Sequence, residues 1–137
     1  MITANDIQVG GQHYKKPGTI QHWDMAARAE LGYFEGQITK YFSRFESKNG
    51  LQDIDKGLHF VEKLIELAEH NRRCQANQAA TFHITEFCRS QGFDNALTSV
   101  LTLCVTWRSA TDLFTVQHDM AHIRRDYNSR TATTSKD

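Results

Sequence analysis

Basic side chains in this sequence are spaced so that several of them could hold one anion. Lys40, Arg44 and Lys48 are four residues apart, and Lys56 and Lys63 are seven apart. Both spacings place side chains on one face of an α-helix. Arginine can bind phosphate oxygens bidentately, and lysine acts as a point charge. The pattern predicts a phosphate-binding surface built from two helices.

A third group of donors lies near the N-terminus. His13, Tyr14, Lys15 and Lys16 follow a pair of glycines that allow the backbone to approach a ligand closely. If this segment folds over the two helices, all three groups converge on one site. The alternative interpretation of the helical lysines is a solvated face, neutralised by nearby carboxylates such as Glu46, Asp55, Glu62 and Glu66.

The helices that would position these charges form a predicted hairpin. Six apolar residues recur at spacings of three and four, which is typical of a helix packed lengthwise on another helix; they are Leu51, Ile54, Leu58, Val61, Ile65 and Ala68. Ile38, Tyr41, Phe42 and Phe45 form a second such stripe upstream. Between the stripes, the polar run 47–50 ends in a glycine, as a helix C-terminus does.

The rest of the chain predicts one all-α domain, with the hairpin as its core and a long C-terminal helix. Residues 1–19 look like a loop, and the Ser/Thr-rich segment 128–137 is expected to be disordered. The domain therefore covers residues 1–127. Periodicity and stop signals predict helices from Thr19 or Gln21 to Leu31 (ended by Gly32), Tyr33 to Ser47, Leu51 to Gln78, Phe82 to Ser90 and Asn95 to Tyr127.

Composition limits the possible functions. Sixteen basic residues balance sixteen acidic ones, so no bulk attraction to nucleic acid or to an anionic membrane is expected and any anion site must be local. Three cysteines without a CxxC pair favour reduced thiols over a disulfide framework or a zinc knuckle. The first residues lack the pattern of a signal peptide, and no apolar run is long enough to span a bilayer. We expect a soluble, cytoplasmic protein.

Familiar catalytic motifs do not occur. The sequence contains no GxxxxGK[ST], GxGxxG, GxSxG or HExxH motif. His118 and His122 share a helical face, but no further ligand completes a metal site, so none is predicted. Five aromatic residues exceed what one small core needs, which predicts that some pack between subunits of a homo-oligomer; they are Phe82, Phe87, Phe93, Trp107 and Phe114.

Several of the residues above also form an ordered series of motifs in residues 9–69. The series reads Gly11-x-His13-Tyr14-Lys15, Ile20-Gln21-x-Trp23-Asp24, Leu31-Gly32-Tyr33-Phe34-Glu35-Gly36-x-Ile38-x-Lys40-Tyr41-x-x-Arg44 and Lys48-Asn49-Gly50-Leu51-x-Asp53-Ile54-x-Lys56, with Phe60 and Lys63. It resembles a family of small tailed-phage proteins, long catalogued as a domain of unknown function, that includes the deoxynucleoside-monophosphate kinase of T-odd coliphages, a kinase without a Walker loop. Residues 70–137 show no such resemblance.

The resemblance implies phosphoryl transfer from a nucleoside triphosphate to dTMP or dGMP by an oligomer in the host cytoplasm; a requirement for Mg²⁺ stays open. Chemistry alone then assigns roles to the residues. Phosphates would be held by His13, Lys15, Lys40, Arg44, Lys48 and Lys56, with Arg44, Lys40 and His13 at the reacting group. Tyr14, Trp23 or Tyr33 would stack on a base, and Asp24, Glu35 or Asp53 would bind base, ribose or metal.

Two other functions are compatible with the sequence. One is a phage protein that binds a nucleotide or a host protein without catalysis. The other is a nucleic-acid binder that uses the same lysines and arginine as a track for the backbone, which the zero net charge disfavours.

Overall fold

The structure of the protein, a computed structural model that describes residues 18–134, is all-α in that part of the chain. The described residues form six helices and no strand, which confirms the predicted all-α class, although the sequence predicts five helices. The helices are α1 (His22–Ala29), α2 (Tyr33–Arg44), α3 (Leu51–Glu69), α4 (Ala80–Gln91), α5 (Asn95–Thr106) and α6 (Ala110–Thr134). None of these helices is both long and apolar enough to cross a membrane.

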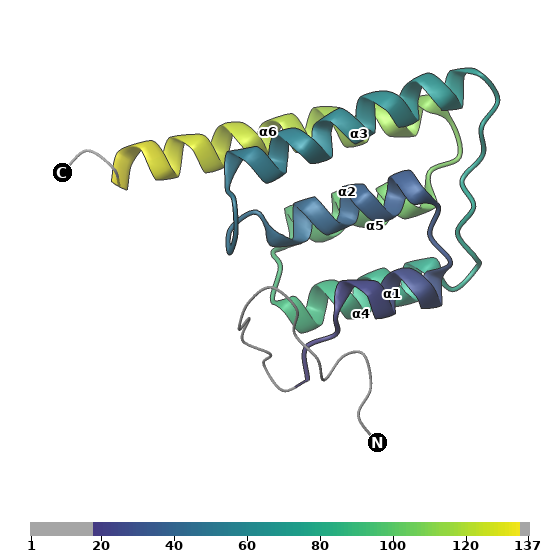
Figure 1. Cartoon of the computed structure of the whole chain (residues 1–137), viewed down its shortest axis with the longest axis horizontal. Coiled ribbons are helices and arrows are strands. Elements are labelled where there is room, and N and C mark those ends of the chain that lie inside the picture. Colours follow the sequence, from purple (N-terminus) through teal and green to yellow (C-terminus); the bar gives the residue numbers. More distant parts are fainter. Residues whose placement is uncertain (1–17, 135–137) are drawn as a thin grey trace.

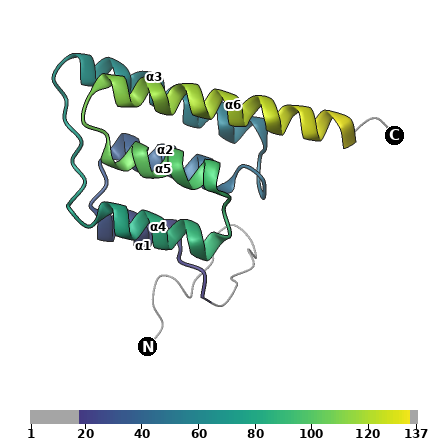
Figure 2. The same ribbon diagram turned by 180° about the vertical axis from the view of Figure 1, so that it is seen from behind.

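The helices form two layers of three. In Figure 1, α1, α2 and α3 lie one above another in the near layer, and α4, α5 and α6 follow the same order behind them. Figure 2 shows the same stacking from the other side. Each near helix packs on one far helix, α1 on α4, α2 on α5 and α3 on α6. The main core lies between the layers, where α2 and α5 face each other.

The predicted hairpin of α2 and α3 is confirmed. Ile54, Val61 and Ile65 of the predicted seam are buried, while the other three seam residues are partly buried against the same core. The turn between the helices ends at Gly50, whose φ of 57° favours glycine. Gly57 lets the helices approach closely, since a Cβ there would lie 2.5 Å from two ring carbons of Phe42.

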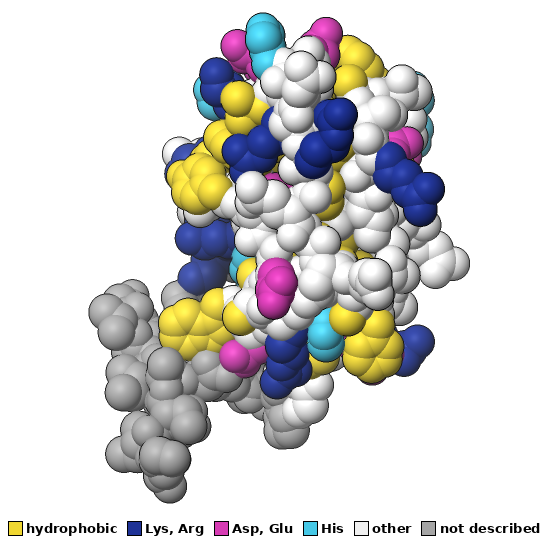
Figure 3. All heavy atoms as spheres, turned by 90° about the vertical axis from the view of Figure 1, so that its right-hand side faces the viewer, with side chains coloured by type: hydrophobic (Ala, Val, Ile, Leu, Met, Phe, Trp, Pro, Cys, Tyr) yellow, Lys and Arg dark blue, Asp and Glu magenta, His cyan; other side chains and the backbone are white. Residues whose placement is uncertain are grey.

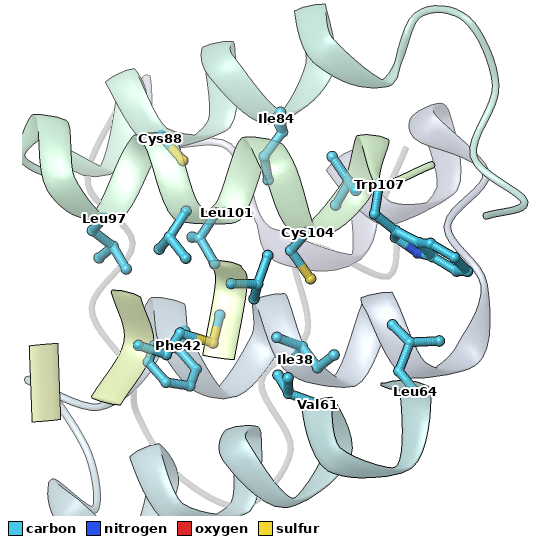
Figure 4. Packing of buried hydrophobic residues seen from close by; sticks show 14 of the residues in the cluster. Ile38, Phe42, Val61, Leu64, Ile84, Cys88, Leu97, Leu101, Cys104 and Trp107 are labelled. Atoms are coloured by element: carbon cyan, nitrogen blue, oxygen red, sulfur yellow. The ribbon is translucent and has the colours of Figure 1, made fainter. Parts of the chain in front are cut away.

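Apolar side chains from both layers fill the space between them. Figure 4 shows Ile38 and Phe42 of α2 directed toward Leu97, Leu101 and Cys104 of α5. All five are buried. The cysteines form no disulfide. Burial raises the pKa of Cys88 to about 11 and that of Cys104 well above its usual range. These two thiols therefore stay protonated near neutral pH and are poor nucleophiles.

Three predicted helix ends in the first half of the chain differ from the structure, and one of them is the end of the second helix, which stops at Arg44 and not at Ser47. The first helix ends at Ala29 because Glu30 adopts a left-handed conformation, so Gly32 caps the start of α2 instead. The third helix ends at Glu69, not near Gln78, because Asn71 is left-handed with φ of 73°. An irregular segment, 70–79, then crosses to the other layer, and the backbone N–H of its Asn77 donates to the Ala29 carbonyl.

Two predictions for the C-terminal half were also wrong. The single helix expected over 95–127 is two helices, because Trp107 is extended at the end of α5 and its indole turns into the core. The second of them, α6, continues through residues 128–134, for which disorder was predicted. Its last turns are held by Arg130, whose guanidinium pairs with Glu46 at 3.0 Å and with Asp126 at 3.1 Å.

The aromatic residues assigned to subunit contacts divide into two groups. Phe87 and Trp107 are buried within the chain and so cannot pack between subunits, whereas Phe93 is partly buried against the core. Phe82 and Phe114 are half-exposed or more and remain available for contact. Homo-oligomerisation stays a prediction.

Candidate functional site

Three cationic groups from two helices surround one tyrosine ring on the outer face of the hairpin. The guanidinium carbon of Arg44 lies 4.8 Å from the centroid of the Tyr41 ring, and the Nζ atoms of Lys40 and Lys56 lie 5.7 and 5.6 Å from it. A cation at such distances is attracted by the negative face of the ring. The ring thus gathers three positive charges that would otherwise repel one another.

Further aromatic rings continue from this point along the hairpin. Phe60 stacks on Tyr41, with ring centroids 6.0 Å apart and an interplanar angle of 14°. Tyr33 and Phe34 meet Phe60 edge-on. We call Lys40, Tyr41, Arg44, Lys56 and Phe60 the Tyr41 cluster. In Figure 3, basic side chains lie next to hydrophobic ones along the left-hand edge, which is the side of the near layer.

The buried carboxylate of Asp53 fixes the position of the Arg44 guanidinium. The Asp53 carboxylate accepts from Arg44 Nη2 and from the backbone N–H of Asn49, each at 3.2 Å. Asp53 is completely buried, whereas the Arg44 side chain is 29% exposed. Asp53 was predicted, as an alternative to Asp24 or Glu35, to bind base, ribose or metal, but the structure turns its carboxylate inward. Both carboxylate oxygens of Asp53 accept hydrogen bonds from within the protein, and these bonds orient Arg44 and the hairpin turn.

Glu35 is likewise buried, with 1% of its surface exposed. Its Oε2 accepts a hydrogen bond of 2.8 Å from the indole N–H of Trp107. The second oxygen, Oε1, is buried without a partner among the described residues and lies against Gly32. The Glu35 side chain, predicted as an alternative ligand, thus points into the core and connects α2 to the end of α5.

The remaining predicted residues are spread more widely. Tyr33 is exposed at the start of α2, and Lys48 is exposed in the α2–α3 turn. Trp23, which is half-exposed, and Asp24 belong to α1, whereas the Tyr41 cluster is built from α2 and α3 alone. His13, Tyr14 and Lys15 lie outside the described residues. Of the predicted phosphate ligands, the structure brings Lys40, Arg44 and Lys56 together.

A shallow hollow of about 530 Å³ adjoins the Tyr41 cluster on α3. Lys56 and Phe60 belong to both, and the hollow is completed by Gln52, Asp55 and His59. The Asp55 carboxylate accepts from Nε of Arg124 in α6 at 2.7 Å and from Nη2 at 3.3 Å. The charge of Asp55 is therefore balanced by a guanidinium and does not cancel that of Lys56.

On the inner side of α2, His22, a partly buried histidine of α1, contacts this helix. The Thr39 hydroxyl lies 2.9 Å from the Glu35 carbonyl oxygen, to which it can donate, and His22 Nε2 lies 2.7 Å from Thr39 Oγ1. Burial, and to a smaller extent the positive charge of Lys40, lower the pKa of His22 from 6.5 to about 4.

This shift predicts a loss of stability in mild acid. A group whose pKa is lowered on folding binds fewer protons in the native state, so its contribution is intact above the unfolded pKa of 6.5 and falls as the pH drops toward 4. Between about pH 7.5 and about pH 5 the free energy of unfolding should fall by roughly 2 kcal/mol more for the natural protein than for His22→Gln. Urea titrations at both pH values measure this, and parallel losses in the two proteins would contradict it.

Tyr41, at the centre of the cluster, was predicted to be an apolar packing residue of the hairpin, and the structure gives it a different environment. The apolar stripe of the hairpin includes Tyr41, yet this residue is only half-buried and presents its ring to three cations. A tyrosine flanked at i−1 and i+3 by basic residues is the signal for this arrangement in the sequence.

Within residues 18–132, no group of three or more His, Cys, Asp or Glu side chains is arranged to hold a metal ion. No protein-family model, curated protein or solved structure matches this chain.

Proposed function

We propose that this protein is a nucleotide kinase that transfers a phosphoryl group from a nucleoside triphosphate to a deoxynucleoside monophosphate, dTMP or dGMP. One observation carries the proposal: Lys40, Arg44 and Lys56, from two helices, surround a single aromatic ring at the surface. The resemblance of residues 9–69 to the phage family supplies the reaction. Neighbouring aromatic rings offer a surface on which a base can stack.

The chemistry needs positioning and positive charge more than it needs a covalent catalyst. An oxygen of the acceptor's phosphate attacks the γ-phosphorus of the triphosphate, and the bond from that phosphorus to the β–γ bridging oxygen breaks. The products are a nucleoside diphosphate and a deoxynucleoside diphosphate. In this proposal Lys40 and Lys56 balance charge on the phosphates. Arg44, oriented by Asp53, presents its remaining donors to the group in transit.

Magnesium enters the proposed reaction as part of the donor substrate. Mg²⁺ in such enzymes is usually held by triphosphate oxygens, water and one or two carboxylates. In the hollow beside the Tyr41 cluster, the Asp55 carboxylate is already paired with Arg124. We therefore assign no resident magnesium ligand to the described residues, and the triphosphate would arrive with its own ion.

The kinase proposal predicts a large loss of turnover from small surface changes. Lys40→Ala and Lys56→Ala should each reduce phosphorylation of dTMP or dGMP by about 100-fold, because each removes a charge that stabilises the transferring group. Transfer of label from γ-labelled triphosphate, followed by thin-layer chromatography, measures the effect. Arg89→Ala is the control, since Arg89 is an exposed cation on α4, in the other layer, and pairs with Glu86.

Full activity in both lysine variants, or no activity in the natural protein with any of the common triphosphates, would contradict the proposal. Lysine is the better choice for this test, because replacing Arg44 also strips a partner from the buried Asp53.

The exposure of Lys40 and Lys56 favours a second candidate, a module that binds a nucleotide or a host protein without catalysis, because an open surface does not exclude water from a reaction. Binding of dTMP without turnover would select it.

A further inference from the structure

The outer face of α2 carries more than the cations already described. Tyr33, Gln37, Lys40 and Arg44 follow one another at spacings of four, three and four, so they form a single stripe along the helix. Tyr33 is 62% exposed. Between Tyr33 and Lys40 the helix rises by roughly 10 Å. An aromatic ring therefore stands at one end of the stripe and the cations at the other.

The charges at the cationic end are not all compensated. Asp53 neutralises Arg44, and Arg124 neutralises Asp55. Within the part of the chain that the structure describes, no carboxylate lies within ion-pair distance of Lys40 or Lys56. The surroundings of the Tyr41 ring thus carry two net positive charges from these two lysines.

Resting on the proposed function, we infer that this site selects a terminal phosphate monoester, and that a nucleoside monophosphate lies lengthwise along α2 with its base on Tyr33. A phosphate monoester carries nearly two negative charges at neutral pH, which matches the two uncompensated lysines. A phosphodiester carries one charge and would leave a lysine unbalanced. Nucleic-acid backbones are instead bound by cations distributed along an extended track.

The middle of the stripe is occupied by an amide. Gln37 is half-buried, and no hydrogen bond joins its side chain to another described residue. An amide side chain can both donate to and accept from a hydroxyl group. With the base on Tyr33 and the phosphate at Lys40, Gln37 lies beside the sugar. We assign it to the 3′-hydroxyl of the deoxyribose.

Binding measurements test the inference separately from catalysis. Isothermal titration of the full chain would compare dTMP with its phosphate methyl ester, which is a diester of one charge, and with a short oligothymidylate. We expect dTMP to bind at least about tenfold more tightly than the methyl ester, since one charge-assisted contact is lost. Lys40→Ala and Lys56→Ala should each remove most of this preference, and Arg89→Ala, on α4 in the other layer, should leave it intact.

The orientation has its own test. Gln37→Ala should weaken binding of dTMP by about threefold to tenfold, as expected for one hydrogen bond, and should leave binding of the 3′-deoxy analogue unchanged. Equal loss for both ligands would overturn the assignment of Gln37.

Equal affinity for dTMP and its methyl ester, tighter binding of the oligothymidylate, or no binding of any of the three would overturn the inference. Turnover with no preference for the monoester would support the kinase proposal and contradict the inference about the monoester. A clear preference for the monoester without turnover would support this inference and contradict the kinase proposal.

Discussion

Replacing Asp53 by alanine is expected to lower the free energy of unfolding by about 3 kcal/mol, because breaking a buried ion pair leaves its partners without compensation. Asp53 is completely buried and is the acceptor both for Arg44 and for the backbone N–H of Asn49. Removing it opens a small cavity and strips an acceptor from the hairpin turn. The partly exposed Arg44 can turn to water, which keeps the loss near the low end for such pairs.

Asp55→Ala is the matched control for this substitution. Asp55 lies on the same helix two residues later, but its side chain is 54% exposed and its pair with Arg124 is at the surface. Exposed pairs contribute at most about 1 kcal/mol. Urea unfolding followed by circular dichroism would compare the two variants. Similar losses would show that burial of the Asp53 carboxylate is not what stabilises the turn.

A methyl group added at Gly57 is the second change with a large expected effect. The new Cβ would meet the ring of Phe42 at 2.5 Å, and that ring is completely buried. Overpacking of this kind costs about 1–3 kcal/mol, against a gain of about 1 kcal/mol in helix propensity. Gly57→Ala should therefore destabilise the protein by up to about 2 kcal/mol, and the bulkier Gly57→Val by about 3 kcal/mol or more.

The same substitution at Gly36 should have the opposite sign. Gly36 is inside α2, and a Cβ there would meet nothing within 4 Å. Gly36→Ala should stabilise the protein by about 0.5–1 kcal/mol. Thermal or urea unfolding of the pair measures both effects. Shortening Phe42 to leucine should cost less in the Gly57→Ala background than alone, because the clash is relieved. Independent effects of the two changes would contradict a direct contact.

The sequence could predict the hairpin because its signals are local. The seam of α3 repeats every three or four residues, and Gly50 ends the turn, so both features lie within a few residues of what they determine. The break between α5 and α6 depends instead on Trp107 reaching Glu35, which is 72 residues away in the chain. No periodicity in residues 95–127 encodes that contact.

The candidate site was predictable in part for the same reason. Helical spacing placed Lys40 and Arg44 on one face, and the hairpin brought Lys56 beside them. The sequence alone could not predict which of the candidate side chains are buried. Glu35 and Asp53 look like ordinary surface carboxylates on their helices, and only the packing of neighbours turns them inward.

The two-layer arrangement has a consequence for how the motif region is understood. The described part of residues 9–69 makes up the near layer alone, a sheet of helices one helix thick whose inner face is covered by α4, α5 and α6. Such a layer has no interior of its own, since its apolar side chains are shielded from water only by the second half of the chain. Any protein that shares these motifs therefore needs a second layer that covers the inner face of these three helices. The sequence of that second layer can differ as long as it presents a matching apolar surface.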